Sequence, residues 1–371
     1  PRIDVALISA PYADRDGNVY FRNAATISEN VEAARAARHN GGQVLVAVSG
    51  LIERDETAVG LPADAIDTVV INPRNEQIAS VPQSDYWPMF TAGANVDEHA
   101  AMARLRFINK VLGITPRRSQ VDDALARLGA VTFVENVAAG ATVNVGVGLS
   151  EEVCRVLYES RVHEQITFTT ESGPYGGLPA PGIFFGAAVD PLRLESSAWM
   201  FRHYREHLDA ALLGFLQLDS AGNINLSNRG PRMLDYVGPG GAPSIIDGAK
   251  TVLFAGKWMQ GAKVSIRDDR LYLDEPGEPK LLERVDEVTF NGRVGLDLGK
   301  QVFYVTDLAL LELTEAGLTL RAVMPGIAVE RDQLANCRAH IHVPSDPVPR
   351  TLPAAVVTGK SFHLAWAEHG A

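Results

Sequence analysis

The sequence predicts an α/β protein with two related open α/β halves, of which the first lacks its N-terminal portion in this chain. Two observations carry the prediction. Similar strand–turn–strand segments occur twice, far apart, and helical segments alternate with short β-branched strands in the second half. Alternation of this kind favours a parallel or mixed sheet with helices on its faces.

The repeated segment is an apolar strand followed by a turn that contains aspartate and a Gly-Asn pair. The turn glycines, Gly17 and Gly222, are 205 positions apart. Glycine supplies the positive φ of such a turn, and the aspartate and asparagine side chains bond to nearby backbone groups. A second apolar segment follows each turn in the same order. Residues 5–8 match residues 211–214, residues 13–19 match residues 218–224, and residues 42–48 match residues 249–255.

The two copies are not equally complete. A long stretch with its own helix, strands and Gly-rich loops, about residues 121–210, precedes the second copy, whereas the first copy begins at residue 3. We therefore expect residues 1–118 to form the later part of a first half, and residues 119–371 to form a second half. Residues 115–120 contain proline and polar residues typical of a linker, and residues 344–371 predict an extended tail.

Helices and strands alternate in the second half. Residues 121–129 have an amphipathic pattern, and residues 150–159 begin with Ser-Glu-Glu, which suits a capped helix N-terminus. The remaining expected elements are strands at residues 141–147, 166–170, 302–305 and 318–323.

Bulk composition excludes several classes of protein. The 371 residues are 46% hydrophobic and 21% charged, an ordinary globular balance. The net charge is -11 and no lysine or arginine cluster is present, which argues against nucleic-acid binding. No apolar run is long enough to span a bilayer, and no N-terminal signal pattern occurs. Cys154 and Cys337 are too few for a disulfide framework, so we expect a cytoplasmic protein.

Glu171 is the first candidate for chemistry. It follows an expected strand and precedes a loop rich in glycine, including Gly173, Gly176 and Gly177. Ligands of open α/β sheets bind at the carboxyl ends of strands, and a carboxylate there can act as a base, a metal ligand or a covalent nucleophile. Taken alone, Glu171 is equally explained as a solvated loop residue or a cap.

Two further glycine loops are candidates for binding. Residues 144–150 join a strand to a helix, so their amides could bind an anion or an oxyanion. The third glycine of a dinucleotide fingerprint is missing there, and a purely structural turn explains the pattern as well. Residues 238–242 could hold a phosphate or pantetheine, or form an ordinary flexible loop.

Cys337, His340 and His342 do not predict a metal site. On a strand the two histidines share one face, but a zinc site needs about four ligands, and no partner pair is evident. We interpret them as surface residues and expect no metal.

Several stretches together resemble the family I CoA transferases, and most closely their one-chain acyl-CoA:acetate/propionate/3-oxoacid branch. The resemblance covers essentially the whole chain, and the order and spacing of the stretches make it specific. They are residues 144–148, 171–179, 185–188, 219–225 and 304–306, with residues 324–327 fitting the closing strand of the branch.

The resemblance implies a role for each candidate. Glu171 occupies the position of the nucleophile that carries CoA as a glutamyl thioester. The amides near Asn144, Gly146 and Gly148 would stabilise oxyanions and bind the acyl group. Residues implied to lie along CoA are Gly173, Gly176, Gly177, Gly238, Gly240 and Gly241. The implied substrates are an acyl-CoA and a carboxylic acid, with no permanently bound cofactor.

Two departures from the family pattern leave alternatives open. The opening sheet of the first half is absent from this chain, which predicts a second polypeptide that supplies it, within a homo- or hetero-oligomer. Residues 204–207, Tyr-Arg-Glu-His, replace the usual consecutive glycines. They either reshape the passage to Glu171 or turn outward. An acyl-CoA thioesterase, a C–C hydrolase or a non-catalytic subunit therefore remains an alternative to a transferase.

Overall fold

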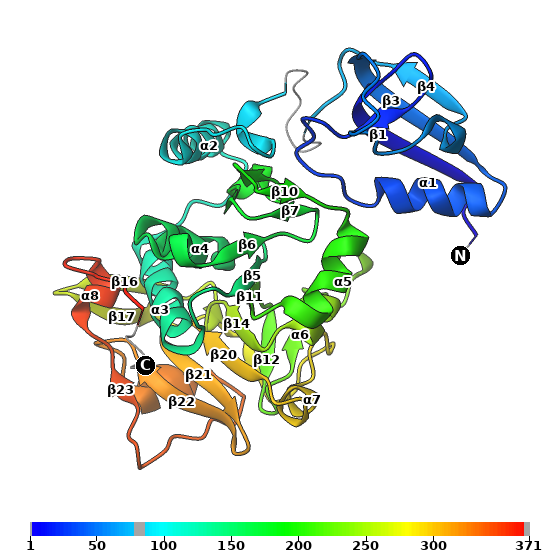
Figure 1. Ribbon diagram of the computed structural model, residues 1–371. Helices are drawn as coiled ribbons and strands as arrows, with labels where there is room; N and C mark the ends of the chain where they lie inside the picture. Colours follow the sequence, from blue (N-terminus) through cyan, green and yellow to red (C-terminus); the bar gives the residue numbers. More distant parts are fainter. Residues whose placement is uncertain (1, 78–85, 367–371) are drawn as a thin grey trace. The chain divides into compact units, whose positions relative to one another are not determined.

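The computed structural model describes residues 2–77 and 86–366, which form two compact units (Figure 1). Unit 1 consists of residues 1–116 and 168–203, and unit 2 of residues 117–167 and 204–371. The boundary passes through β6 (Thr167–Thr169) and α5 (Ser197–His207).

Unit 1 contains a small sheet with the order β2-β1-β3-β4, in which β1, β3 and β4 run parallel. Alternate residues of β1 and β3, including Ile8 and Val46, form an apolar core with Ala34 and Ala37 of α1. The helix covers this face because its alanines allow close approach to the strands. The elements are β1 (Val5–Ala13), β2 (Val19–Tyr20), α1 (Asn30–His39), β3 (Gln43–Leu51) and β4 (Thr68–Ile71).

The rest of unit 1 is a helix and short strands around residue 171. In α2, Asp97 caps the first turn by accepting a hydrogen bond from Ala100 N, and Gly113 ends the helix in the left-handed conformation. Strand β7 pairs antiparallel with both β6 and β10. The elements are α2 (Glu98–Leu112), β7 (Pro174–Tyr175), β8 (Leu178–Pro179), β9 (Ala188–Val189) and β10 (Arg193–Leu194).

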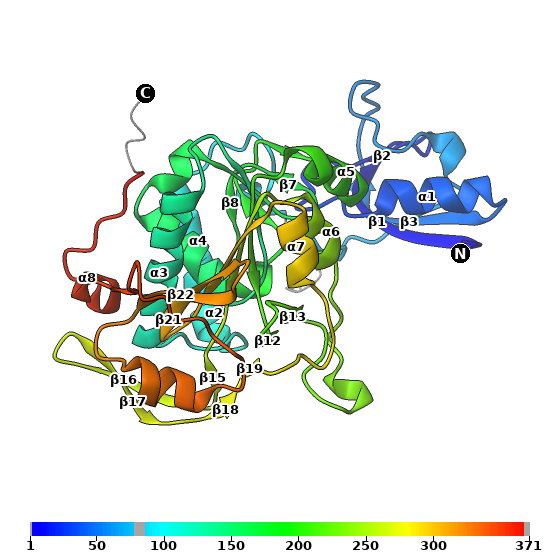
Figure 2. The same ribbon diagram turned by 90° about the horizontal axis from the view of Figure 1, so that it is seen from below.

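Unit 2 is built on parallel strands in the order β5-β11-β14-β20, extended by the antiparallel strands β21 and β22. Helices α3 and α4 lie on one face, and α6 and α7 on the other (Figures 1 and 2). Because both faces are covered, strands such as β14 are apolar and buried throughout. The elements are α3 (Gln120–Asn136), β5 (Thr142–Val145), α4 (Leu149–Glu159), β11 (Ala210–Gly214), α6 (Ala242–Gly248), β14 (Thr251–Ala255), α7 (Gly292–Asp297), β20 (Gln301–Val305), β21 (Ala309–Thr314) and β22 (Gly317–Val323).

Shorter elements complete unit 2. They are β12 (Gln217–Asp219), β13 (Ile224–Asn225), β15 (Met259–Gln260), β16 (Lys263–Arg267), β17 (Arg270–Glu275), β18 (Glu278–Pro279), β19 (Leu281–Leu282), β23 (Arg350–Thr351) and α8 (Ala354–Thr358).

The repeated turn has the same hydrogen bonds in both copies. Asp14 accepts from Asp16 N and from the backbone and side chain of Asn18, at 2.8–3.0 Å. Asp219 accepts from Ala221 N and from the backbone and side chain of Asn223, at 3.0–3.1 Å. This agreement supports the predicted repeat at the level of individual atoms.

The strands around each turn correspond as well, with two adjustments. The spacing of the Asp14 and Asp219 turns matches Val5 with Ala210, and these residues pair with Gln43 and Thr251 of the neighbouring strands. Segment similarity predicts Val5 with Ala211 and Gln43 with Lys250, so each strand match is wrong by one residue. The α/β class is confirmed, while the division into halves at residue 118 stays a prediction.

Element boundaries differ from prediction in three places. Helix α3 continues to Asn136 rather than ending at residue 129, because the second stretch also buries apolar residues. Residues 324–327, expected in a strand, form a turn after β22. The expected extended tail contains β23 and α8, and its residues 367–371 lie outside the described part of the chain.

We expect Asp14→Ala to lower the free energy of unfolding by about 2 kcal/mol, because buried backbone and side-chain donors lose their acceptor. Burial raises the pKa of Asp14, but hydrogen bonds from Asn18, Tyr20 and Asp16 outweigh it and lower that pKa from 3.8 to about 2. The stability that Asp14 contributes should therefore be complete above about pH 4 and fall as the pH approaches 2. Urea unfolding at several pH values measures both effects.

Asp16→Ala is the matched control in the same turn. Asp16 is exposed and pairs with Arg54, so its loss should change stability by less than about 0.5 kcal/mol. Equal effects of the two substitutions would contradict the assigned role of Asp14.

Candidate active site

Glu171 lies at the tip of the hairpin that joins β6 to β7, in unit 1. Thr169 pairs with Tyr175 across the hairpin. Thr170 N donates to Pro174 O at 3.2 Å, and Gly173 N donates to Thr170 O at 3.2 Å. The Glu171 side chain is partly exposed. These backbone hydrogen bonds close the turn, and the partly exposed Glu171 carboxylate lies at its tip.

Side-chain hydroxyls on either side of Glu171 hold this turn. Thr170 Oγ1 donates to Gly186 O at 3.0 Å, and Ser172 Oγ donates to the same carbonyl. Ser28 N also donates to Ser172 O at 3.1 Å. Because the residues before and after Glu171 share an acceptor, the glutamate backbone is held on both sides.

Gly173 is required by the packing of the turn. Its φ is +132°, and a Cβ there would lie 2.3 Å from Glu195 O. A Cβ at Gly177 would likewise lie 2.3 Å from Val189 O. These close backbone approaches explain the glycines independently of CoA.

Aromatic rings pack beside this hairpin. Arg193 lies over the rings of Tyr175 and Trp199, at 4.2 and 4.9 Å from their centroids. Trp199 stacks on His203 with a centroid distance of 4.6 Å. Phe184 is buried against Phe90 and belongs to the core.

The loop after β5 lies in unit 2, and its amides are already partly used. Gly146 N donates to Leu212 O at 2.7 Å. Gly148 N donates to the Glu151 carboxylate at 2.7 Å, which confirms the predicted capped start of α4. No hydrogen bond from Val147 N is found within the described residues, so Val147 presents the open amide of this loop. The sequence analysis named the neighbouring Gly146 and Gly148 as oxyanion-binding candidates and did not name Val147. Asn144 is buried, and its side chain donates to Tyr204 Oη at 3.2 Å.

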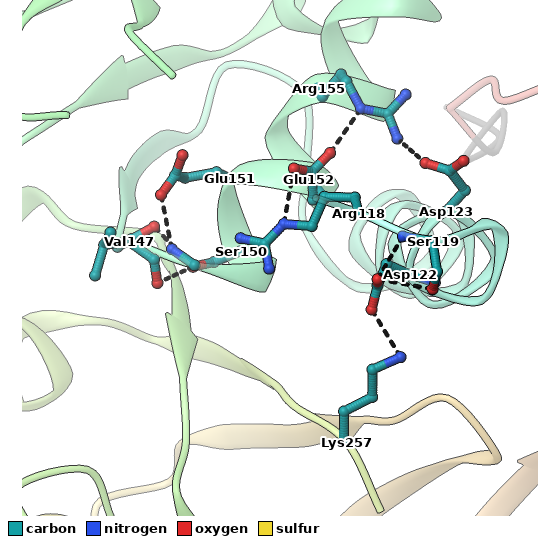
Figure 3. A network of polar contacts seen from close by, with 12 residues as sticks. Arg118, Ser119, Asp122, Asp123, Val147, Ser150, Glu151, Glu152, Arg155 and Lys257 are labelled. Carbon is teal, nitrogen blue, oxygen red and sulfur yellow. Dashed lines mark hydrogen bonds and ion pairs between the residues drawn. The ribbon is translucent and has the colours of Figure 1, made fainter. Parts of the chain in front are cut away.

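Ion pairs fix this loop through α4 and α3 (Figure 3). Glu152 accepts from Arg118 and Arg155, at 3.2 and 2.8 Å, and Arg155 also reaches Asp123 of α3. Asp122 forms the capping box at the start of α3 and pairs with Lys257 at 2.7 Å. The network therefore connects both helices to the segment that follows β14.

A buried charged cluster follows β14 and β20, and the sequence reasoning had assigned it no role. Lys257 lies 3.7 Å from Asp307, whose second oxygen accepts from Trp258 N at 2.8 Å. Lys280 donates to Phe215 O at 2.9 Å. Burial raises the pKa of Asp307, and burial lowers the pKa of Lys280 to about 8. The only sequence signal was the position of Lys257 and Asp307 directly after buried parallel strands, whereas Lys280 lies between β18 and β19.

Gly176 lies in unit 1 beside Gly177, and the remaining predicted residues lie in unit 2. Gly238, Gly240 and Gly241 form the loop before α6, and a Cβ at Gly240 would meet nothing within 4 Å. Residues 205–207 are exposed on the last turn of α5, with Glu206 3.7 Å from His207. A cavity of about 840 Å³ in this unit is lined by the Asp219 turn, Arg284 and Arg338, and none of the predicted site residues lines it.

The described residues contain no group of three or more histidine, cysteine, aspartate or glutamate side chains placed to hold a metal. No helix among them is long and apolar enough to cross a membrane.

We expect Gly173→Ala to lower stability by at least about 2 kcal/mol more than Gly93→Ala. Both glycines have positive φ, so both alanine variants bear backbone strain, but only the Gly173 variant adds a collision with a carbonyl oxygen. Urea unfolding of the two variants measures the difference. Equal losses would show that the close approach at Gly173 relaxes easily.

Burying the charged form of Lys280 lowers the free energy of unfolding, and we expect this loss to depend on pH. Its pKa is about 8 in the folded protein and 10.5 in the unfolded reference. Between these values the unfolded state holds more protons, so stability should rise with pH by about 3 kcal/mol. Lys280→Met should remove that rise, whereas Lys263→Met, at an exposed lysine of β16, should keep it. Identical pH profiles for the two variants would contradict the prediction.

No protein-family model matches the chain. Curated relatives do match: the chain is 31% identical over 340 residues to caffeate CoA-transferase of Acetobacterium woodii, covering 90% of this chain and 62% of the relative. It is 27% identical over 338 residues to acetate CoA-transferase YdiF of Escherichia coli K12, covering 89% and 59%. The chain thus spans about three fifths of the length of these relatives.

Solved structures agree on the fold. Acyl-CoA transferase YdiF of Escherichia coli O157:H7, as the apoenzyme and as a thioester complex with CoA, superimposes with a TM-score of 0.81 at 24% identity. Each comparison covers 98% of this chain and 65% of the other. These relatives, which are named CoA-transferases, match nine tenths of the chain, and the solved acyl-CoA transferase structures share its fold, in agreement with the predicted resemblance to the family I CoA transferases.

Proposed function

We propose that this chain is the catalytic part of an enzyme that moves CoA between an acyl-CoA and a carboxylic acid, with Glu171 as covalent nucleophile. The observation that carries the proposal is the position of Glu171 at a hairpin tip, between two hydroxyls that share one carbonyl acceptor. A nucleophile must be exposed to substrate and yet held in place. The transferase names of the relatives agree with this role.

The reaction proceeds by two acyl exchanges at Glu171. The carboxylate attacks the thioester carbonyl, and the C–S bond breaks to give an acyl–glutamyl anhydride and CoA thiolate. The thiolate attacks the glutamyl carbonyl, which releases the donor carboxylate and leaves a glutamyl-CoA thioester. An incoming carboxylate reverses both steps and leaves as the new acyl-CoA. Each exchange conserves the activated acyl bond, so no external energy source is needed.

Each attack creates an oxyanion, which backbone amides can stabilise. As the family resemblance implies, we propose the loop of Asn144, Gly146 and Gly148 for oxyanion and acyl binding. Within unit 2 the amides of Gly146 and Gly148 donate to Leu212 O and to Glu151, so Val147 N is our candidate donor in this loop. Gly173, Gly176, Gly177 and the loop of Gly238, Gly240 and Gly241 are our candidates for contacts along CoA.

A second polypeptide completes the first half of the enzyme in this proposal, within an oligomer. The chain spans only about three fifths of its relatives, so their full activity requires residues that lie elsewhere. Cys154 and Cys337 are free thiols, which supports a reducing, cytoplasmic location.

We expect Glu171→Gln to lower CoA transfer by on the order of 10³-fold or more, because an amide cannot form the anhydride. Glu164→Gln, which removes an exposed partner of Arg161, is the matched control and should retain transfer. Rates are measured with the complete enzyme, an acyl-CoA and a carboxylic acid acceptor. Full activity of Glu171→Gln would exclude the covalent role.

Trapping distinguishes the transferase from the hydrolase and from the non-catalytic subunit. Incubation with acyl-CoA alone should add the mass of CoA, less water, to the peptide that contains Glu171. Added carboxylate should discharge it as acyl-CoA. Steady CoA release without any acceptor would instead favour a hydrolase, and absence of the adduct in an active complex would favour a non-catalytic role.

A further inference from the structure

Arg193 lies beside the hairpin that carries Glu171. It belongs to β10, where it pairs with Tyr175 of β7, the second strand of that hairpin. At the tip, Glu195 N donates to Gly173 O at 3.0 Å. Strand β10 therefore follows the hairpin up to the turn of Glu171, and all of these residues belong to unit 1.

Hydrogen bonds in the turn indicate which side of the hairpin Glu171 faces. The hydroxyls before and after it both point to one carbonyl oxygen, that of Gly186, so the glutamate between them points to the other side. Side chains alternate along a strand, and Thr169, two residues before Glu171, therefore also lies on that other side. Tyr175 is opposite Thr169, and Arg193 is opposite Tyr175. Because residues paired across strands share a face, Arg193 lies on the side of Glu171.

Two aromatic rings and a carboxylate fix the guanidinium of Arg193. Its Cζ atom lies 4.2 Å from the ring centroid of Tyr175 and 4.9 Å from that of Trp199. The two rings stand at 83° with their centroids 6.2 Å apart, so the guanidinium occupies the corner between them. Its Nε atom forms an ion pair with Glu195 at 3.2 Å. Contact with the rings and an ion pair through one edge together hold the orientation of the group.

The Trp199 ring is itself held at the start of α5. It stacks on His203 with a centroid distance of 4.6 Å and 14° between the planes. Trp199 N donates to Ser196 Oγ at 3.2 Å, and this hydroxyl donates to Glu32 of α1 at 2.7 Å. Because α1 fixes this first turn, the corner that holds Arg193 is preformed.

The outer edge of the Arg193 guanidinium is open. Within the described residues neither Nη atom forms a hydrogen bond or an ion pair, and the side chain is 48% exposed. The N–H bonds of the two Nη atoms lie in one plane and match the two oxygens of a carboxylate. The chemistry assigned to Glu171 does not use this edge. A carboxylate that stands near Glu171 can therefore bind it through two hydrogen bonds.

We propose that Arg193 determines substrate specificity by binding a second carboxylate of the acid that reacts at Glu171. The preferred acids are then dicarboxylic, with one carboxylate at the glutamyl thioester and the other on the Nη atoms of Arg193. Glu171 carries no charge in the thioester, so it does not repel the second carboxylate of an incoming acid. The inference rests on the proposed function and adds the class of acid to it.

Discharge of the charged enzyme tests this preference. The complete enzyme is charged at Glu171 with an acyl-CoA, as in the trapping experiment, and acids are then added. Succinate, glutarate and adipate are each compared with the monocarboxylic acid of the same chain length, which is butyrate, pentanoate or hexanoate. At least one dicarboxylic acid should discharge the enzyme with a higher second-order rate constant than its monocarboxylic counterpart. Arg193→Gln should lower that constant roughly 10-fold or more and leave the monocarboxylic constant within about twofold.

Two further variants separate binding of the acid from packing. Arg104→Gln is the matched control, because Arg104 also lies over a ring of unit 1, at 4.6 Å from the centroid of Trp87. It should leave the preference for the dicarboxylic acid unchanged. Arg193→Lys keeps the charge but lacks the planar pair of donors, so it should retain only part of the preference.

Three results would overturn the assignment of Arg193. They are a wild-type enzyme that prefers none of the dicarboxylic acids, equal losses with both kinds of acid in Arg193→Gln, and slower charging by acyl-CoA in that variant with an unchanged acid preference. In each case Glu171 is still charged, so the proposed function remains. Failure of acyl-CoA to charge the wild-type enzyme would instead contradict the proposed function, and this inference with it.

Discussion

Burial of a parallel sheet on both faces is the constraint on which unit 2 depends. Its central strands β11 and β14 are almost entirely apolar because helices α3 and α4 cover one face and α6 and α7 the other. Polar chemistry is thereby confined to the loops at the strand ends. The loop of Val147, the segment at Lys257 and the buried Asp307 all follow such strands. On the sheet of unit 1, Leu7 is 76% exposed, whereas its counterpart Leu212 in unit 2 is 1% exposed.

Hydrogen bonds and close packing account for the glycines of the candidate motifs. In unit 2, Gly146 and Gly148 donate within the protein, and in unit 1, Gly173 and Gly177 lie against backbone carbonyls. These glycines thus have structural reasons to be glycine. Beside them, Glu171 of unit 1 is partly exposed, and no hydrogen bond from Val147 N of unit 2 is found within the described residues. A motif in the sequence marks a region, and its hydrogen bonds decide which atoms are available.

Charge in unit 2 is organised around the start of α3. Asp122 caps the helix and binds Lys257, which also lies near Asp307, while Glu152 and Arg155 join α3 to α4. Burial shifts the pKa of Asp307 upward and that of Lys280 downward, so both shifts favour the neutral forms. Moving one member of this cluster would leave a buried charge without its partner, which costs free energy. The cluster therefore resists deformation.

The sequence by itself determined the α/β class, the repeated aspartate turn, the capped start of α4 and the resemblance to CoA transferases that the ordered motifs carry. Each of these depends on local patterns: alternation of elements, turn residues at fixed spacing, or an ordered set of motifs. Only the tertiary structure decided which loop amides are already bonded, that Lys257, Lys280 and Asp307 meet, and that Leu7 is open where Leu212 is buried. These features depend on contacts between segments distant in the chain, and local residue patterns do not specify such contacts.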